Sequence, residues 1–155
     1  MAPEGLYNAL QITPDLLSAG QPSAEQLRAL AAAGVHTVIN LATPASENHL
    51  PEEAELLAGL GLRYIPIPVV WTDPRPEDFA RFEAVMVSLP PGPVLLHCAA
   101  NFRATAFYAL YAERHKGWTT AQGEAFRAQL WQGYQEPAWE QFLTEMRAQS
   151  PKPGA

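Results

Sequence analysis

Residues 94–105 read VLLHCAANFRAT, and this stretch decides the fold that the sequence predicts. Its first three residues are apolar and follow the breaker PPGP at 90–93, which predicts a short buried strand. The stretch leads into residues that are apolar almost all round, which predicts a helix buried on most of its faces. A tight loop must join the strand to the helix, and it holds Cys98, the only cysteine of the chain.

A loop of this kind is a natural site for an anion. Where a strand turns into the start of a helix, backbone N–H groups and the positive helix end are directed at one point. Arg103 at the helix start can pair bidentately with a phosphate-like anion, and Asn101 tolerates the positive φ that a tight anion-binding turn needs. Thr105 adds a hydroxyl. The alternative for Cys98 is a buried small hydrophobic residue.

Before this stretch, predicted strands alternate with predicted helices. Each helix is indicated by its capping residues and its apolar spacing. The expected order is a turn and short strand within 10–20, a helix from the capping box Ser23–Gln26 to Gly34, a buried strand over 35–41, a polar loop over 42–49, a helix from Pro51 to 59–61, an extended segment over 64–70, a loop over 71–76, and a helix from Glu77 with Phe79, Phe82, Met86 and Leu89 on its inner face.

After this stretch, the sequence predicts helices only. One opens with the capping box Thr119–Gln122, and the last starts at Pro137 with apolar residues at helical spacing. We therefore predict one α/β domain over 1–149, with a mainly parallel central sheet of four to five strands, flanking helices and a helical C-terminal third against one side, and a tail over 150–155. Ligands of such sheets bind beyond the carboxyl ends of the strands, where the Cys98 loop must lie.

Composition limits the partners and cofactors that we expect. The net charge of −6, without a Lys/Arg run, argues against nucleic acid. The N-terminal residues lack a signal-peptide pattern, no apolar run approaches the ~20 residues of a membrane span, and a single cysteine suits a reducing compartment. We expect a soluble cytoplasmic protein with no membrane partner. The four histidines show no metal-ligand spacing, so we expect no metal and no other cofactor.

The pattern His97-Cys98-x-Ala100-Asn101-x-Arg103 resembles the active-site loop of the cysteine-dependent protein tyrosine phosphatases. That family has five residues between Cys and Arg, whereas here there are four. Thr105 keeps the family's spacing from cysteine to hydroxyl. Shortened loops occur in a bacterial branch, the phosphatase-like domain of beta-lactamase hydrolase-like proteins, which this chain also resembles at 18–22 and 38–41. The resemblance implies a tyrosine phosphatase-like fold.

The resemblance also implies a role for each matching residue. Cys98 would attack phosphorus, and Thr105 would hydrogen-bond the sulfur and help it to leave. Arg103 would hold the phosphoryl oxygens in the transition state. His97 would support the loop from the strand end, or is simply a buried histidine bonded to backbone. The predicted phosphate-binding loop consists of His97, Cys98, Ala99, Ala100, Asn101, Phe102 and Arg103.

The family's general acid is the Asp of a Trp-Pro-Asp loop. Trp71-Thr72-Asp73 is similar, so Asp73 is the candidate, although it could simply cap the following helix. Asp78 is a second candidate, better explained as an acid of the first helical turn.

The implied activity is a metal-free phosphatase with a cysteinyl-phosphate intermediate. Its substrate would be a phosphotyrosine or dual-specificity phosphoprotein, or a small phosphoester. The alternatives are a rhodanese-like sulfurtransferase with a persulfide on Cys98 and a non-catalytic phosphate-binding module. The oligomeric state is not indicated.

Overall fold

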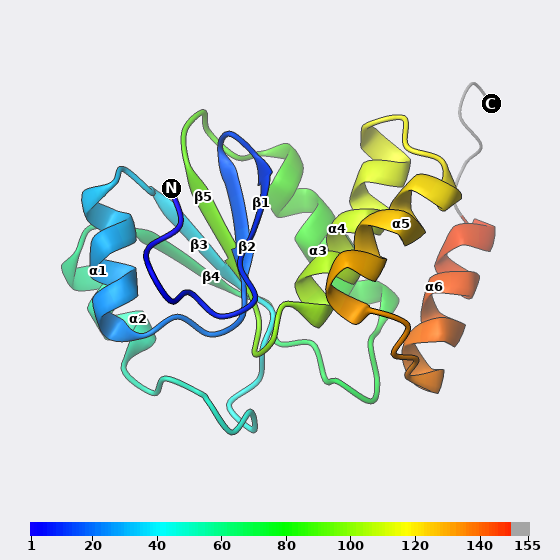
Figure 1. Ribbon diagram of the computed structural model, residues 1–155, viewed down its shortest axis with the longest axis horizontal. Coiled ribbons are helices and arrows are strands. Elements are labelled where there is room, and N and C mark those ends of the chain that lie inside the picture. The colour runs from blue at the N-terminus through cyan, green and yellow to red at the C-terminus, as the bar shows by residue number, and fades with distance from the viewer. Residues whose placement is uncertain (150–155) are drawn as a thin grey trace.

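Five short strands form the central sheet of the computed structural model, which describes residues 1–149 (Figure 1). Their order across the sheet is β1-β2-β5-β3-β4; only β1 and β2 pair antiparallel, and the other neighbours are parallel. This confirms the mainly parallel sheet, while the tail expected over 150–155 lies outside the described residues. The bounds are β1 (Leu10–Thr13), β2 (Leu16–Ala19), β3 (Thr37–Asn40), β4 (Arg63–Pro66) and β5 (Val94–His97).

The predicted strand at 94–96 is the central strand β5. It pairs with β2 on one side and β3 on the other, so that His97 lies between Ala19 and Asn40. All four β5 residues are buried. An unbroken apolar run is typical of a parallel strand covered on both faces, since consecutive side chains point to opposite faces and both must avoid water.

Helices cover both faces of the sheet (Figure 1). Leu95 joins a core with the helices of one face, and Leu96 joins the larger core with the helices of the other. The single α/β domain and the C-terminal helices packed on one side are therefore confirmed. On the first face lie α1 (Ala24–Ala32) and α2 (Glu53–Gly59), and on the second α3 (Pro76–Val87), α4 (Phe102–His115), α5 (Thr120–Trp131) and α6 (Pro137–Gln149).

Local signals placed most helices correctly. Both predicted capping boxes are formed, at Ser23 before α1 and at Thr119 before α5. The helix α4 is buried from Arg103 to Ala112, as its apolar sequence predicts. The two prolines predicted to keep residues 64–70 at a sheet edge agree with β4, which is an edge strand.

Several predicted boundaries were wrong. The segment before β2 forms a strand of its own, β1, because the two short apolar pieces pair as a hairpin. The strand predicted over 35–41 shortens to β3, and the extended segment over 64–70 is a strand only as far as Pro66. α2 begins at Glu53, two residues after Pro51, and α3 ends at Val87, so Leu89 packs on the core from beyond the helix.

Candidate active site

The loop from Cys98 to Asn101 lies beyond the carboxyl end of β5 and leads directly into α4. Asn101 is the N-cap residue of this helix and has a φ of 69°. The sequence predicted this positive φ, which Asn tolerates better than most residues. Its side-chain amide donates to the carbonyl of Asn8 at 2.8 Å and to the hydroxyl of Ser18 at 3.1 Å, which fixes the turn to the N-terminal segment and to β2.

Three consecutive carbonyl groups of the loop are hydrogen-bonded to groups outside it. The Cys98 carbonyl accepts from Nδ1 of His97 at 3.1 Å. The Ala99 carbonyl accepts from the Gln21 backbone N–H and from the side chain of Asn48, at 3.0 and 2.9 Å. The carbonyl of Ala100 accepts from the Asn8 side chain at 3.0 Å. These hydrogen bonds fix the direction of the three carbonyl groups.

The direction of the carbonyls determines where the loop amides point. In a planar trans peptide the C=O of one residue and the N–H of the next point in opposite directions. The N–H groups of Ala99, Ala100 and Asn101 therefore point away from the donors that bind the carbonyls of Cys98, Ala99 and Ala100, respectively. Loop amides at the start of a helix can form an anion site, and the anion site of the Cys98 loop stays a prediction.

A cavity of about 340 Å³ opens beside the loop. Both Cys98 and Arg103 line it, although only four residues separate them. Arg103 lies in the first turn of α4 and is 6% exposed, and its Nη1 donates to the Val69 carbonyl at 2.8 Å. The structure therefore brings Cys98 and Arg103 to one cavity. Its lining residues are Trp71, Cys98, Ala99, Ala100, Phe102, Arg103 and Tyr134.

One wall of this cavity is aromatic. The rings of Trp71 and Phe102 lie 6.2 Å apart edge to face, and Phe102 meets Tyr134 at 6.1 Å. Behind them, the indole of Trp131 donates to the Phe102 carbonyl at 3.1 Å, and that of Trp139 donates to the Trp71 carbonyl at 2.6 Å. These two indoles therefore hold the wall in place.

Thr105 is fully buried in α4. Its hydroxyl donates to the carbonyl of Asn101 at 2.8 Å and lies 3.1 Å from that of Phe102. In this arrangement the single hydroxyl proton is engaged by the helix backbone, not by the sulfur of Cys98. The predicted contact of Thr105 with the sulfur is therefore not made in this structure, because a buried hydroxyl on a helix has backbone carbonyls within reach.

His97 is fully buried, and its Nδ1 lies 3.1 Å from the Cys98 carbonyl oxygen, which is the backbone bond that the sequence analysis offered for it. Its Nε2 also lies 2.7 Å from Oε2 of Glu53, which is 2% exposed at the start of α2. Gln21 donates to the other oxygen of Glu53 at 2.6 Å. Burial acts to raise the pKa of Glu53, but the hydrogen bond and charge of His97 and the bond from Gln21 outweigh it and hold this pKa below its ordinary value.

The two candidate general acids lie elsewhere. Asp73 is exposed and pairs with Arg75, whose Nη2 donates to it at 2.8 Å. Asp78 accepts the backbone N–H of Arg75 at 3.2 Å and so caps the start of α3, as its alternative reading predicted. Among the described residues that line the cavity, the nearest in sequence to Asp73 is Trp71.

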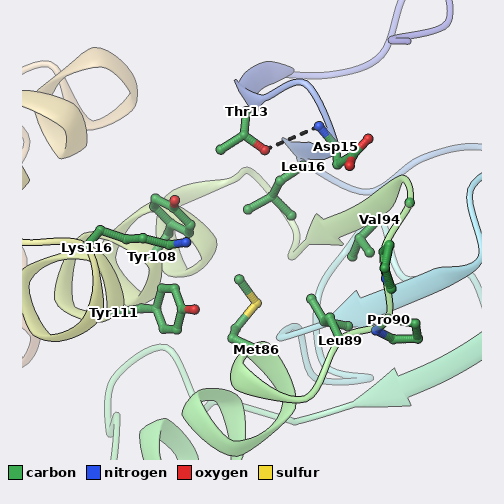
Figure 2. A pocket seen from close by; sticks show the side chains of 12 residues that line it. Thr13, Asp15, Leu16, Met86, Leu89, Pro90, Val94, Tyr108, Tyr111 and Lys116 are labelled. Atoms are coloured by element: carbon green, nitrogen blue, oxygen red, sulfur yellow. Dashed lines mark hydrogen bonds between the residues drawn. The ribbon is translucent and has the colours of Figure 1, made fainter.

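A second hollow, of about 190 Å³, lies at the opposite end of the sheet (Figure 2). There the starts of β2 and β5, marked by Leu16 and Val94, face Tyr108, Tyr111 and the end of α4. None of the predicted site residues lies among the described residues that line it. Cys98, Ala99, Ala100, Phe102 and Arg103 of the predicted loop line the first cavity instead.

Two further properties concern residues 1–149. They contain no cluster of three or more His, Cys, Asp or Glu side chains arranged to hold a metal ion. None of their helices combines the length and the apolar character that a membrane crossing needs.

Solved structures resemble the chain over nearly its whole length, whereas no protein-family model and no curated protein matches its sequence. A protein of Shewanella putrefaciens CN-32, described as a "Putative phosphatase (DUF442)", shares 36% identity with a TM-score of 0.83, over 96% of this chain and 94% of that chain. The core catalytic domain of the PP-IP phosphatase SIW14 of S. cerevisiae shares 13% identity, with a TM-score of 0.74 over 96% of this chain and 91% of its own. P. aeruginosa TpbA shares 19% sequence identity with a TM-score of 0.68, over 90% of this chain and 84% of its own.

The fold of the chain is that of these solved phosphatase structures. The likeness to the Shewanella protein shows that this chain belongs to the DUF442 family of putative phosphatases.

The structure also adds residues that the sequence did not reveal. The backbone of Gln21 and the side chains of Asn8 and Asn48 orient the loop, and Glu53 and Tyr134 reach it from distant elements. Only the segment 18–22 carried a signal, through its resemblance to the bacterial branch. Glu53 lies in the first turn of α2, where an acid is favourable on local grounds alone, so its sequence context does not indicate a buried partner.

Proposed function

We propose that this protein hydrolyses phosphomonoesters through a cysteinyl-phosphate intermediate on Cys98. The observation that carries the proposal is the cavity that both Cys98 and Arg103 line, beside a loop whose carbonyls are hydrogen-bonded to neighbouring groups. The Cys98 thiolate attacks phosphorus, the ester oxygen leaves with a proton from a general acid, and water then releases phosphate from sulfur. Arg103 and the loop amides stabilise the negative charge of the equatorial oxygens in both transition states.

We further propose that Asp73 is the general acid. We also propose that the domain spans residues 1–149. Asp73 lies two residues from Trp71, which lines the cavity, and its loop joins β4 to α3 on the surface. Thr105 would assist the departure of sulfur by turning its hydroxyl from the Asn101 carbonyl toward Cys98.

For the substrate, we propose a phosphotyrosine or dual-specificity phosphoprotein, or a small phosphoester. The aromatic wall of Trp71, Phe102 and Tyr134 can pack against a flat apolar leaving group. P. aeruginosa TpbA, which has the same fold, has been solved in complex with pTyr.

The decisive experiment measures hydrolysis of an aryl phosphate by the purified protein in excess chelator, with Cys98→Ser as the matched variant. We expect wild type to turn over, the variant to lose nearly all activity, and acid quenching during turnover to trap phosphate on Cys98. Equal activity in both proteins would refute the proposal. A one-sulfur mass increase on Cys98 after thiosulfate, without phosphate release, would establish the sulfurtransferase instead. Thermal protection by vanadate without turnover would indicate a binding module.

A further inference from the structure

A buried polar chain lies behind the phosphate loop, and the proposed reaction does not use it. Glu53 on α2 contacts the imidazole of His97 at 2.7 Å, and both side chains are almost without exposure. Gln21, from the connection between β2 and α1, donates to the other carboxylate oxygen. A buried carboxylate is costly unless it is paired and hydrogen-bonded, so this arrangement requires an explanation.

The partners of His97 determine its protonation. Its Nδ1 faces the Cys98 carbonyl oxygen, which can only accept, and its Nε2 faces an oxygen of Glu53. Nδ1 must therefore carry a proton, and a second proton lies between Nε2 and the carboxylate. An imidazole ordinarily binds a proton more tightly than a carboxylate does. The second proton therefore belongs to the ring, and the pair is an imidazolium with a carboxylate.

Other groups around the pair are consistent with an ionised Glu53. His49, in the segment before α2, adds a favourable charge, and Gln21 supplies an N–H donor. Tyr64 on β4 accepts a hydrogen bond from Asn40. Burial raises the pKa of Tyr64, which the Asn40 bond lowers and the charge of Glu53 raises, so this phenol stays neutral. Cys98 and Arg103 lie on the cavity side of the loop.

We propose that Glu53 is a positioning residue that holds His97 as an imidazolium directly behind Cys98. The imidazolium keeps the Cys98 carbonyl turned outward, which directs the next amide toward the anion. It also stabilises the Cys98 thiolate, because the positive member of the pair is the nearer one: His97 adjoins Cys98 and contacts its carbonyl, whereas Glu53 contacts the far nitrogen. The inference rests on the proposed function, since only a thiolate nucleophile benefits from this charge.

Glu53→Gln removes the charge and keeps the shape of the pair. The variant's amide oxygen can still accept from Gln21, its NH₂ group can donate to a bare Nε2, and Nδ1 can still donate to the Cys98 carbonyl. A change in this variant therefore reports the charge and not lost packing. Because Cys98 is the only cysteine, the rate of its alkylation by iodoacetamide measures the thiolate without any turnover.

The test combines two measurements on the purified protein. Nitrogen NMR of His97 at pH 7 should show both ring nitrogens protonated in wild type and one in Glu53→Gln. The pH midpoint of Cys98 alkylation should move upward in the variant, so that alkylation at pH 6 slows by about tenfold, equivalent to a midpoint displaced by about one pH unit. Glu52→Gln, which changes the exposed neighbouring acid, should behave as wild type.

A single proton on His97 in wild type would overturn the proposal, whether or not the variant folds. An unchanged alkylation profile in a folded Glu53→Gln protein would do the same. If both measurements give the expected result while wild type hydrolyses no phosphoester, the proposed function fails and the role of Glu53 stands.

Discussion

At the scale of single residues, the position of Arg103 matters most, because only four residues separate it from Cys98. Its loop is one residue shorter than that of the tyrosine phosphatases, yet Arg103 lines the same cavity as Cys98. The reason is the Val69 carbonyl, which accepts from Nη1 at 2.8 Å and fixes the direction of the side chain. Val69 itself is held by the backbone bond of its N–H to the Leu41 carbonyl.

We predict that Arg103→Lys lowers kcat/KM by about 10²-fold or more. A lysine keeps the positive charge but cannot bind a phosphoryl group bidentately while also donating to Val69. Steady-state kinetics with an aryl phosphate measures the loss. A change below threefold would mean that Arg103 supplies charge alone.

We predict that Asp73→Asn lowers kcat by about 10²-fold or more, because a general acid typically contributes 10²–10⁴ in rate. Stability should change by less than about 0.5 kcal/mol, since the ion pair of Asp73 with Arg75 is exposed. Asp78→Ala is the comparison: it removes the acceptor at the start of α3 and should lower the melting temperature with little effect on kcat. A threefold loss or less in Asp73→Asn, with a large one in Asp78→Ala, would reverse the assignment.

At the scale of elements, the turn after β2 packs closely against the Cys98 loop. A Cβ added to Gly20 would lie 2.7 Å from the Ala99 carbonyl oxygen and 3.2 Å from the Ala100 Cα, both backbone atoms. The next residue, Gln21, donates its N–H to Ala99 and its side chain to Glu53. The segment 18–22 and the Cys98 loop are therefore in backbone contact.

We predict that Gly20→Ala shifts the phosphate loop and lowers both stability and activity. Forcing a methyl group into a packed site costs typically ~1–3 kcal/mol. Chemical denaturation would give the free energy of unfolding, and the phosphatase assay should show at least about a tenfold loss of kcat/KM, from misplaced loop amides. Gly59→Ala, at a position where an added Cβ meets no atom within 4 Å, is the control and should keep wild-type activity.

At the scale of the whole molecule, ion pairs join the three helices of the C-terminal part. Arg147 of α6 contacts Glu113 of α4 at 2.9 Å and Glu124 of α5 at 3.0 Å. Arg127 of α5 contacts Glu124 at 2.8 Å and Glu140 of α6 at 2.9 Å. The hydrogen bond from Arg127 lowers the pKa of Glu124, burial opposes it, and the bond from Arg147 lowers it further. The network fastens α5 and α6 to α4, which carries Arg103.

We predict a pH-dependent gap in stability between wild type and Glu124→Gln. A carboxylate whose pKa is lowered in the folded state stabilises the fold at pH values above its ordinary pKa of 4.5. This contribution is lost as the pH falls through the lower pKa of the folded state. At pH 7 wild type should be more stable by about 0.5–1 kcal/mol, a discounted figure because Glu124 is partly exposed. Denaturant titrations at pH 7 and below pH 4 measure the gap, which should close in acid; a constant gap would contradict this.

The sequence by itself determined the order of strands and helices, the sheet end that carries the Cys98 loop and the positive φ of Asn101. These features depend on local periodicity, capping residues and turn chemistry, which neighbours in the chain specify. Only the tertiary structure decided that Glu53 meets His97, that Val69 aims Arg103 and that Asp73 pairs with Arg75 away from the cavity lining. The physical reason is that the partner of a polar group depends on which elements the sheet order brings together, and a first-turn acid such as Glu53 has the same local pattern whether it faces water or a buried histidine.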